Sequence, residues 1–85
     1  MVKETVTAPE LLKRLRFFEA EAEKAYDRMY DARPGAELAA CYSDVKEAFH
    51  EAIAFARRLK LERETDRLEK RLAEIKTIFR RQFPA

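Results

Sequence analysis

Residues 38–79 read LAACYSDVKEAFHEAIAFARRLKLERETDRLEKRLAEIKTIF, and a phase break in this stretch decides the fold. Apolar residues first recur at alternating spacings of four and three, which is one stripe along one helix. From Leu61 the series resumes on another face. Because a helix cannot bury both faces against one partner, we expect a turn between about Leu59 and Glu62. The first stripe is Leu38, Tyr42, Val45, Phe49, Ala52, Ala56 and Leu59, and the second is Leu61, Thr65, Leu68, Leu72, Ile75 and Phe79.

Lys60 lies between the two stripes, at the expected end of the middle helix. Glycine is the usual residue at such a position. We predict that Lys60 adopts a left-handed conformation and that Leu61 folds back toward Ala56, as in a common helix stop. A further helix then follows from about residue 62 to residue 83, and Pro84 ends it.

The start of the first helix is marked by Thr7, Pro9 and Glu10, which form a predicted capping box with proline in the first turn. Pro34 and Gly35 form the next break and indicate a tight turn. We therefore predict helices at about 8–32, 36–59 and 62–83, and we expect residues 1–6 to be disordered. The stripe of the first helix is Leu11, Leu15, Phe18, Ala22, Ala25, Met29 and Ala32.

The predicted fold is an all-α, up-down-up bundle of three long amphipathic helices, which makes residues 1–85 a single domain. The middle helix has the broadest apolar face, with Ile53 and Phe55 beside its stripe, as a helix with two neighbours requires. The alternative is a dimer in which long hairpins pair into a larger bundle.

Two aromatic residues, Phe17 and Tyr30, lie off the stripe of the first helix. They are the candidate residues for an interaction or dimerisation patch. The alternative is that both are scattered apolar side chains on an ordinary surface.

The composition is that of a small globular protein. The 85 residues are 47% hydrophobic and 40% charged, with a formal net charge of +2. One cysteine cannot form an internal disulfide, no uncharged run is long enough to span a bilayer, and the first residues lack the apolar core of a signal peptide. We expect a cytoplasmic protein without membrane insertion.

The sequence offers few residues for catalysis or metal binding. Cys41 and His50 are nine residues apart on one helix and point in opposite directions at about 100° per residue. Glu47 and His50 form one Glu-x-x-His, but a di-iron or di-manganese centre needs two copies and two further glutamates, hence a homodimer. We expect no catalytic residues, metal or cofactor.

Basic residues gather at the pole shared by the start of the first helix, the end of the second and the start of the third. Acidic residues lie among them, and no pattern of a known nucleic-acid module accompanies them. Nucleic-acid or other anion binding is therefore an alternative that we do not favour. The basic residues are Lys13, Arg14, Arg16, Arg57, Arg58, Lys60, Arg63 and Arg67.

Residues 42–53 read YSDVKEAFHEAI, with an aromatic, small residues and an aliphatic at Tyr42, Ala48, Phe49, Ala52 and Ile53. This pattern resembles the second helix of microtubule-interacting-and-trafficking domains and of tetratricopeptide hairpins. The resemblance implies a helical adaptor module that lays a partner's amphipathic helix into a groove between two of its own.

The function that we predict is protein-protein interaction without catalysis, as an adaptor or a self-associating module. Grooves between long amphipathic helices suit this role. The first alternative is a metal-binding or enzymatic bundle assembled across a homodimer through Glu47 and His50. The second is anion binding through the basic pole.

Overall fold

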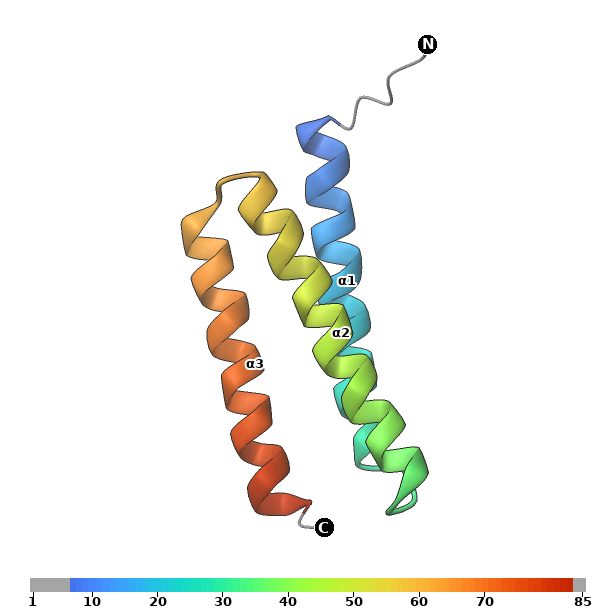
Figure 1. The fold of residues 1–85 in the computed structure, drawn as a ribbon. Helices are drawn as coiled ribbons and strands as arrows, with labels where there is room; N and C mark the ends of the chain where they lie inside the picture. Colours follow the sequence, from blue (N-terminus) through green and yellow to red (C-terminus); the bar gives the residue numbers. More distant parts are fainter. Residues whose placement is uncertain (1–6, 84–85) are drawn as a thin grey trace.

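The computed structural model describes residues 7–83, in which three helices pack side by side (Figure 1). They are α1 (Ala8–Met29), α2 (Ala36–Arg58) and α3 (Glu62–Gln82). Successive helices run in opposite directions, so α1 and α3 are parallel to each other and antiparallel to α2. The predicted all-α, up-down-up three-helix bundle is confirmed.

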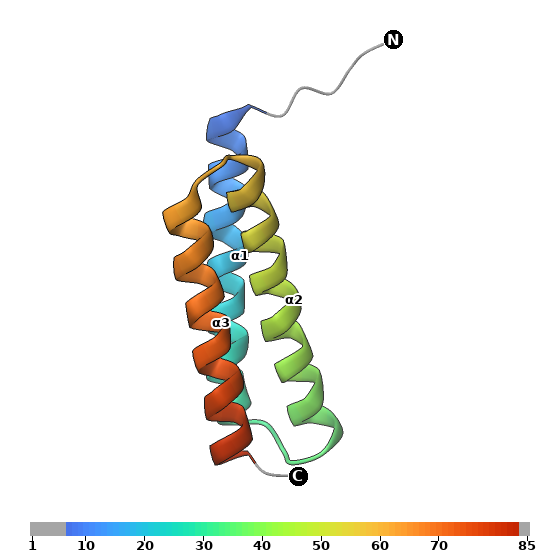
Figure 2. The ribbon, with the colours of Figure 1, turned by 60° about the vertical axis from the view of Figure 1, so that its left-hand side comes forward.

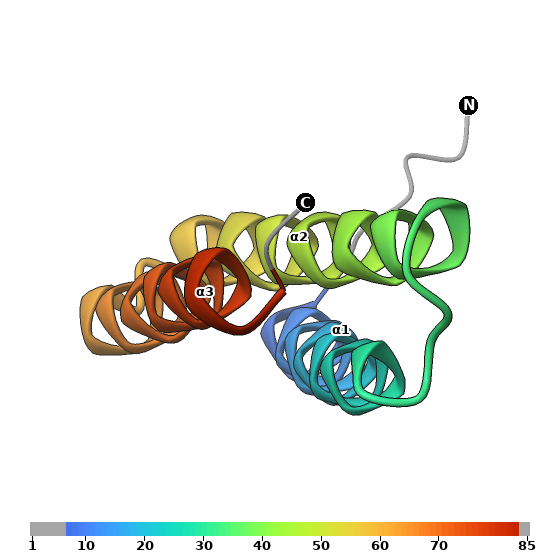
Figure 3. The ribbon, with the colours of Figure 1, turned by 90° about the horizontal axis from the view of Figure 1, so that it is seen from below.

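The two connections lie at opposite ends of the bundle. The start of α1 lies at the end where α2 turns into α3, and the end of α3 lies near the turn from α1 to α2 (Figure 2). Seen from below, α1 and α3 lie on the same side of α2 (Figure 3). The middle helix therefore packs against both other helices, as its broad apolar face predicts.

Thr7 caps the start of α1, as the sequence predicts. Its Oγ1 accepts a hydrogen bond from the Glu10 backbone N–H at 3.4 Å, which satisfies one of the free donors of the first turn. The Glu10 carboxylate lies 3.6 Å from the Arg14 guanidinium instead of reaching back to the cap. In the described chain the capping box is therefore formed by its Thr7 half.

The end of α1 differs from the prediction. The helix ends at Met29, not at Ala32, and the next backbone N–H groups bond three residues back, from Asp31 to Arg28 and from Ala32 to Met29. Such bonds tighten the last turn of a helix. Arg33 precedes proline, which disfavours helical backbone at that residue, so the chain leaves the helix before Pro34.

The turn between α2 and α3 is the predicted helix stop. Lys60 has φ +58°, the one non-glycine residue of the described chain with positive φ. Its N–H bonds to the Arg57 carbonyl at 3.0 Å, and the Leu61 N–H bonds to the Ala56 carbonyl at 3.0 Å. These two bonds define a Schellman motif, in which the left-handed residue is usually glycine. One continuous helix through Lys60 is excluded.

Glycine at position 60 is expected to stabilise the protein. Lys60→Gly removes the strain of a side chain at positive φ, while the greater freedom of glycine in the unfolded chain offsets part of the gain. The expected net gain in the free energy of unfolding is up to about 1 kcal/mol. Urea unfolding of the two proteins measures it, and a loss of stability would contradict the left-handed turn.

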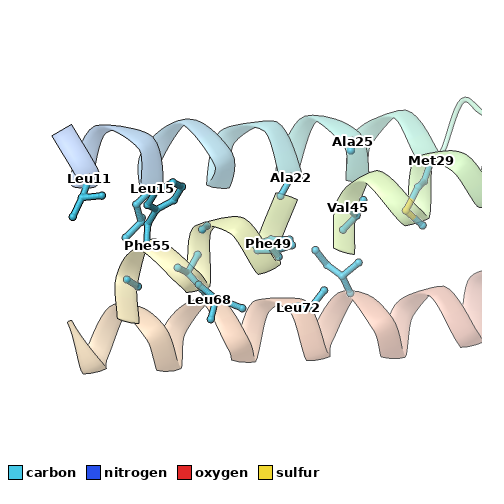
Figure 4. Close-up of a cluster of buried hydrophobic side chains, with 14 residues drawn as sticks. Leu11, Leu15, Ala22, Ala25, Met29, Val45, Phe49, Phe55, Leu68 and Leu72 are labelled. Carbon is cyan, nitrogen blue, oxygen red and sulfur yellow. The ribbon is translucent and has the colours of Figure 1, made fainter. Parts of the chain in front are cut away.

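The core runs the length of the bundle and receives side chains from all three helices (Figure 4). Phe49 of α2 lies at its centre, and Leu15 of α1 and Leu68 of α3 are also fully buried. Both predicted stripes of residues 38–79 face this core, with their outer members half-buried or, at Leu61, exposed. The buried residues are Leu11, Leu15, Ala22, Ala25, Met29, Val45, Phe49, Ala52, Ile53, Phe55, Ala56, Leu68, Leu72 and Ile75.

Charged side chains lie on the outer faces of the helices, and no polar or charged residue of the described chain is buried. Among residues 7–83, no helix combines the length and the apolar character needed to cross a membrane.

Ion pairs join the parallel helices α1 and α3. The Arg67 guanidinium donates to both carboxylate oxygens of Glu19, at 2.6 and 2.9 Å. Arg71 donates to both oxygens of Glu23 at 2.8 and 2.9 Å, one turn further along. Each pair joins residues 48 positions apart, so α1 and α3 run in constant register. We call these contacts the α1–α3 ladder.

Candidate interaction surfaces

Phe17 and Tyr30 are both exposed, as the sequence predicts, but they lie on different sides of α1. The Phe17 side chain is 57% exposed and lies beside α2, where it borders a hollow with Asp44 and Glu47. The Tyr30 side chain is 52% exposed and lies beside α3, where its hydroxyl donates to Gln82 at 3.1 Å. The two residues therefore belong to two surfaces.

The more apolar surface is a hollow of about 760 Å³ between the start of α2 and the end of α3. It lies at the end of the bundle where the chain turns from α1 to α2, and most of its lining side chains are apolar. We call it the aromatic groove. Its lining residues are Pro34, Gly35, Leu38, Ala39, Phe79, Arg80 and Phe83.

Two aromatic residues that line the aromatic groove, Phe79 and Phe83, belong to a longer row of rings in contact. The Phe79 ring stacks on Tyr42 of α2, with 3.7 Å between centroids and 3° between planes. Phe83 continues the stack at 5.7 Å from Phe79 and meets the Tyr30 ring edge-on at 5.2 Å. Because stacked rings add to the energy of burial, the end of α3 is held in place by contacts with both other helices.

Tyr30 is fixed by hydrogen bonds as well as by ring contacts. The Tyr26 and Tyr30 hydroxyls lie 2.8 Å apart, and Tyr30 donates to Gln82, so Tyr26 is the donor of the first bond. Burial, together with this bond, raises the pKa of Tyr26 to about 12. The rotamer of Tyr30 is thus determined by its neighbours.

Positive charge borders the aromatic groove. Arg80 lines it, Arg81 follows in the last turn of α3, and Arg33 directly precedes Pro34. Within the described part of the chain, none of these three side chains forms an ion pair. A ligand in the groove would meet apolar walls and the Arg80 guanidinium, which forms no ion pair with residues 7–83.

The second surface is a hollow of about 610 Å³ between α1 and α2, which we call the acidic groove. Phe17 meets Phe18 edge-on, with 5.3 Å between ring centroids, and Phe18 stacks on Phe55 at 5.8 Å. The exposed ring is thereby held against the core. The charged residues that line this groove are Glu21, Arg28, Asp44, Glu47 and Glu51, four carboxylates and one arginine.

Half of the cations of the predicted basic pole, four of eight, form ion pairs with acidic residues. Glu64 forms ion pairs with Arg16 at 2.7 Å and with Arg67 at 3.0 Å, and Arg67 also pairs with Glu19. These guanidinium groups hold the pKa of Glu19 and of Glu64 below the ordinary value, above all through hydrogen bonds from Arg67. Arg57 pairs with Glu69 at 2.7 Å. The cations of the pole without an ion pair in the described chain are Lys13, Arg58, Lys60 and Arg63.

The residues considered for metal binding lie on the surface of α2. Glu47 and His50 are both exposed, and Cys41 is half-buried. No group of three or more histidine, cysteine or acidic side chains among residues 7–83 is arranged to hold a metal ion.

The aromatic groove was not predicted as a surface. The stripe analysis assigns Phe79 to the core and gives Phe83 no role, because the exposed side of a half-buried ring cannot be inferred from spacing. The available signal was local: Phe79, Arg80, Arg81 and Phe83 place two aromatic and two basic residues in the last turn of a helix.

Comparison with protein-family models, with curated proteins and with solved structures finds no match to this chain. The resemblance of residues 42–53 to helical adaptor modules stays a prediction.

Proposed function

We propose that this chain is a non-catalytic protein-binding module that receives an amphipathic helix in the aromatic groove. The observation that carries the proposal is the apolar lining of a groove open to solvent between two packed helices. Helical modules commonly bind partners by laying the apolar face of a helix into such a groove. A cytoplasmic location is part of the proposal and rests on the single cysteine.

The charge around the groove supports an acidic partner. Arg33, Arg80 and Arg81 form no ion pair with residues 7–83, so carboxylates on a bound helix would gain partners without displacing others. Electrostatic complementarity of this kind selects among partners more than it adds to affinity. The proposed occupant is therefore an amphipathic helix with apolar side chains on one face and carboxylates beside them.

A pair of labelled peptides tests this function. The probe is an 18-residue fluorescein-labelled helix with a leucine stripe and glutamate at the other positions, and its counterpart carries lysine instead. By fluorescence anisotropy, the glutamate peptide is expected to bind at least about tenfold more tightly than the lysine peptide. Phe83→Ser is expected to weaken its binding by about tenfold, since the ring forms part of the wall.

Charge reversal provides a matched control. Arg80→Glu/Arg81→Glu should weaken binding of the glutamate peptide by at least about tenfold. Lys13→Glu/Arg63→Glu makes the same change in net charge at the opposite pole and should change binding by less than about threefold. Equal effects of the two variants would overturn the assignment to this groove. Binding only after removal of residues 84–85 would mean that the chain covers the groove itself, which would also overturn it.

A further inference from the structure

The acidic groove is complementary to the aromatic groove in charge and offers an exposed apolar ring. It presents one exposed ring, Phe17, and its lining includes four carboxylates against one arginine. The aromatic groove presents apolar walls and the Arg80 guanidinium, and Arg33 and Arg81 are next to its lining residues in the sequence; none of the three forms an ion pair in the described chain. One surface has an exposed aromatic ring that borders an acidic hollow, and the other is an apolar hollow lined by one arginine.

These two surfaces cannot meet within one molecule. Both include residues of α2, but Leu38 and Ala39 line the aromatic groove while Asp44, Glu47 and Glu51 line the acidic groove. At about 100° per residue, the two sets lie on roughly opposite sides of α2. The contact that pairs them must therefore join two molecules.

We propose that the partner is a second copy of this chain, which docks Phe17 into the aromatic groove of its neighbour. Glu47 and Glu51 of one copy then face Arg80 and Arg81 of the next. This inference rests on the proposed function, because it uses the same groove, and it names the partner. The contact is heterologous: each copy keeps one free acidic groove or one free aromatic groove, so association continues into a ring or an open chain.

Concentration dependence is the first test. By sedimentation velocity from about 1 to 500 μM, the wild-type chain is expected to pass through dimers to larger species, as a heterologous contact requires. Raising the salt concentration from 50 to 500 mM should weaken association by at least about tenfold, since exposed charge pairs are screened. Far-ultraviolet circular dichroism of each variant below verifies that helicity is unchanged.

Complementation of two variants is the decisive test. Phe17→Ser/Glu47→Lys removes the exposed ring of the acidic groove and keeps the aromatic groove, whereas Phe83→Ser/Arg80→Glu does the reverse. Each variant alone is expected to stay monomeric at concentrations where the wild type associates. An equimolar mixture holds one intact acidic groove with Phe17 and one intact aromatic groove, so it should form a heterodimer and nothing larger.

The alternatives give different results. A wild-type dimer that never grows, or a mixture that remains monomeric, would overturn the head-to-tail contact. A wild-type chain that is monomeric throughout would also overturn it, but binding of the glutamate peptide would then still support the proposed function. Conversely, association restored in the mixture together with equal binding of the two peptides would support this contact and reject an acidic helix as a general ligand of the groove.

Discussion

Replacing Phe49 by alanine is expected to lower the free energy of unfolding by about 3 to 5 kcal/mol. The Phe49 side chain is 0% exposed and is among the largest fully buried side chains of the described chain. Its removal takes away contacts with the surrounding core and leaves a cavity that long, straight helices cannot close. For a chain of this length, total stability is about 4 to 13 kcal/mol, so the loss is a large share of it. Urea unfolding followed by circular dichroism measures the change.

Two controls accompany Phe49→Ala. His50→Ala changes the next residue, which is exposed, and should alter stability by less than about 0.5 kcal/mol. Phe17→Ala makes the same chemical change at a ring that is 57% exposed and should cost far less than Phe49→Ala. If His50→Ala proved as harmful as Phe49→Ala, the face of α2 that points to the core would be wrong.

Leu68→Ala is expected to cost about 2 to 5 kcal/mol, the second large effect. The described part of α3 has three buried residues, Leu68, Leu72 and Ile75, and Leu68 is 0% exposed. Losing one of three removes a large part of the apolar contact that holds α3 to the rest of the bundle. Urea unfolding of the wild type and the variant gives the difference.

Leu12→Ala is the matched control for Leu68→Ala, because it makes the same substitution at a side chain that is 39% exposed. It should change stability by no more than about 0.5 kcal/mol. Similar losses for the two leucines would show that α3 is not packed on the core through Leu68.

The fold could be predicted from the sequence because its deciding signals are local. The stripe along α2 and the change of face at Leu61 involve residues that are neighbours along the chain. A helix stop likewise depends on five or six consecutive residues. The left-handed Lys60 is confirmed for that reason. The end of α1 was placed three residues late because alanine at position 32 continues the stripe, whereas the restriction that Pro34 imposes on Arg33 governs the backbone.

The surfaces were harder to predict because they depend on how helices are placed relative to each other. Phe17 and Tyr30 were identified correctly as exposed, but spacing on α1 does not tell which neighbour each one faces. The α1–α3 ladder was missed although its signal exists: Glu19 and Glu23 on α1 match Arg67 and Arg71 on α3 in spacing and opposite sign. Recognising it requires knowing that the two helices are parallel and adjacent.

The α1–α3 ladder bears on which helix separates from the bundle most easily. Of the fourteen buried side chains, α1 and α2 contribute eleven and α3 contributes three. The contacts of α3 with α1 include the surface ion pairs of the ladder and the ring and hydroxyl contacts of Tyr30 with Phe83 and Gln82. Exposed ion pairs contribute little and are screened by salt. We therefore expect detachment of α3 about the Lys60 turn to take less free energy than separation of the α1–α2 hairpin, and we expect the amide protons of α3 to exchange with solvent first. Since Phe79 and Phe83 leave with α3, detachment dismantles the aromatic groove, and any occupant of that groove slows the exchange of α3.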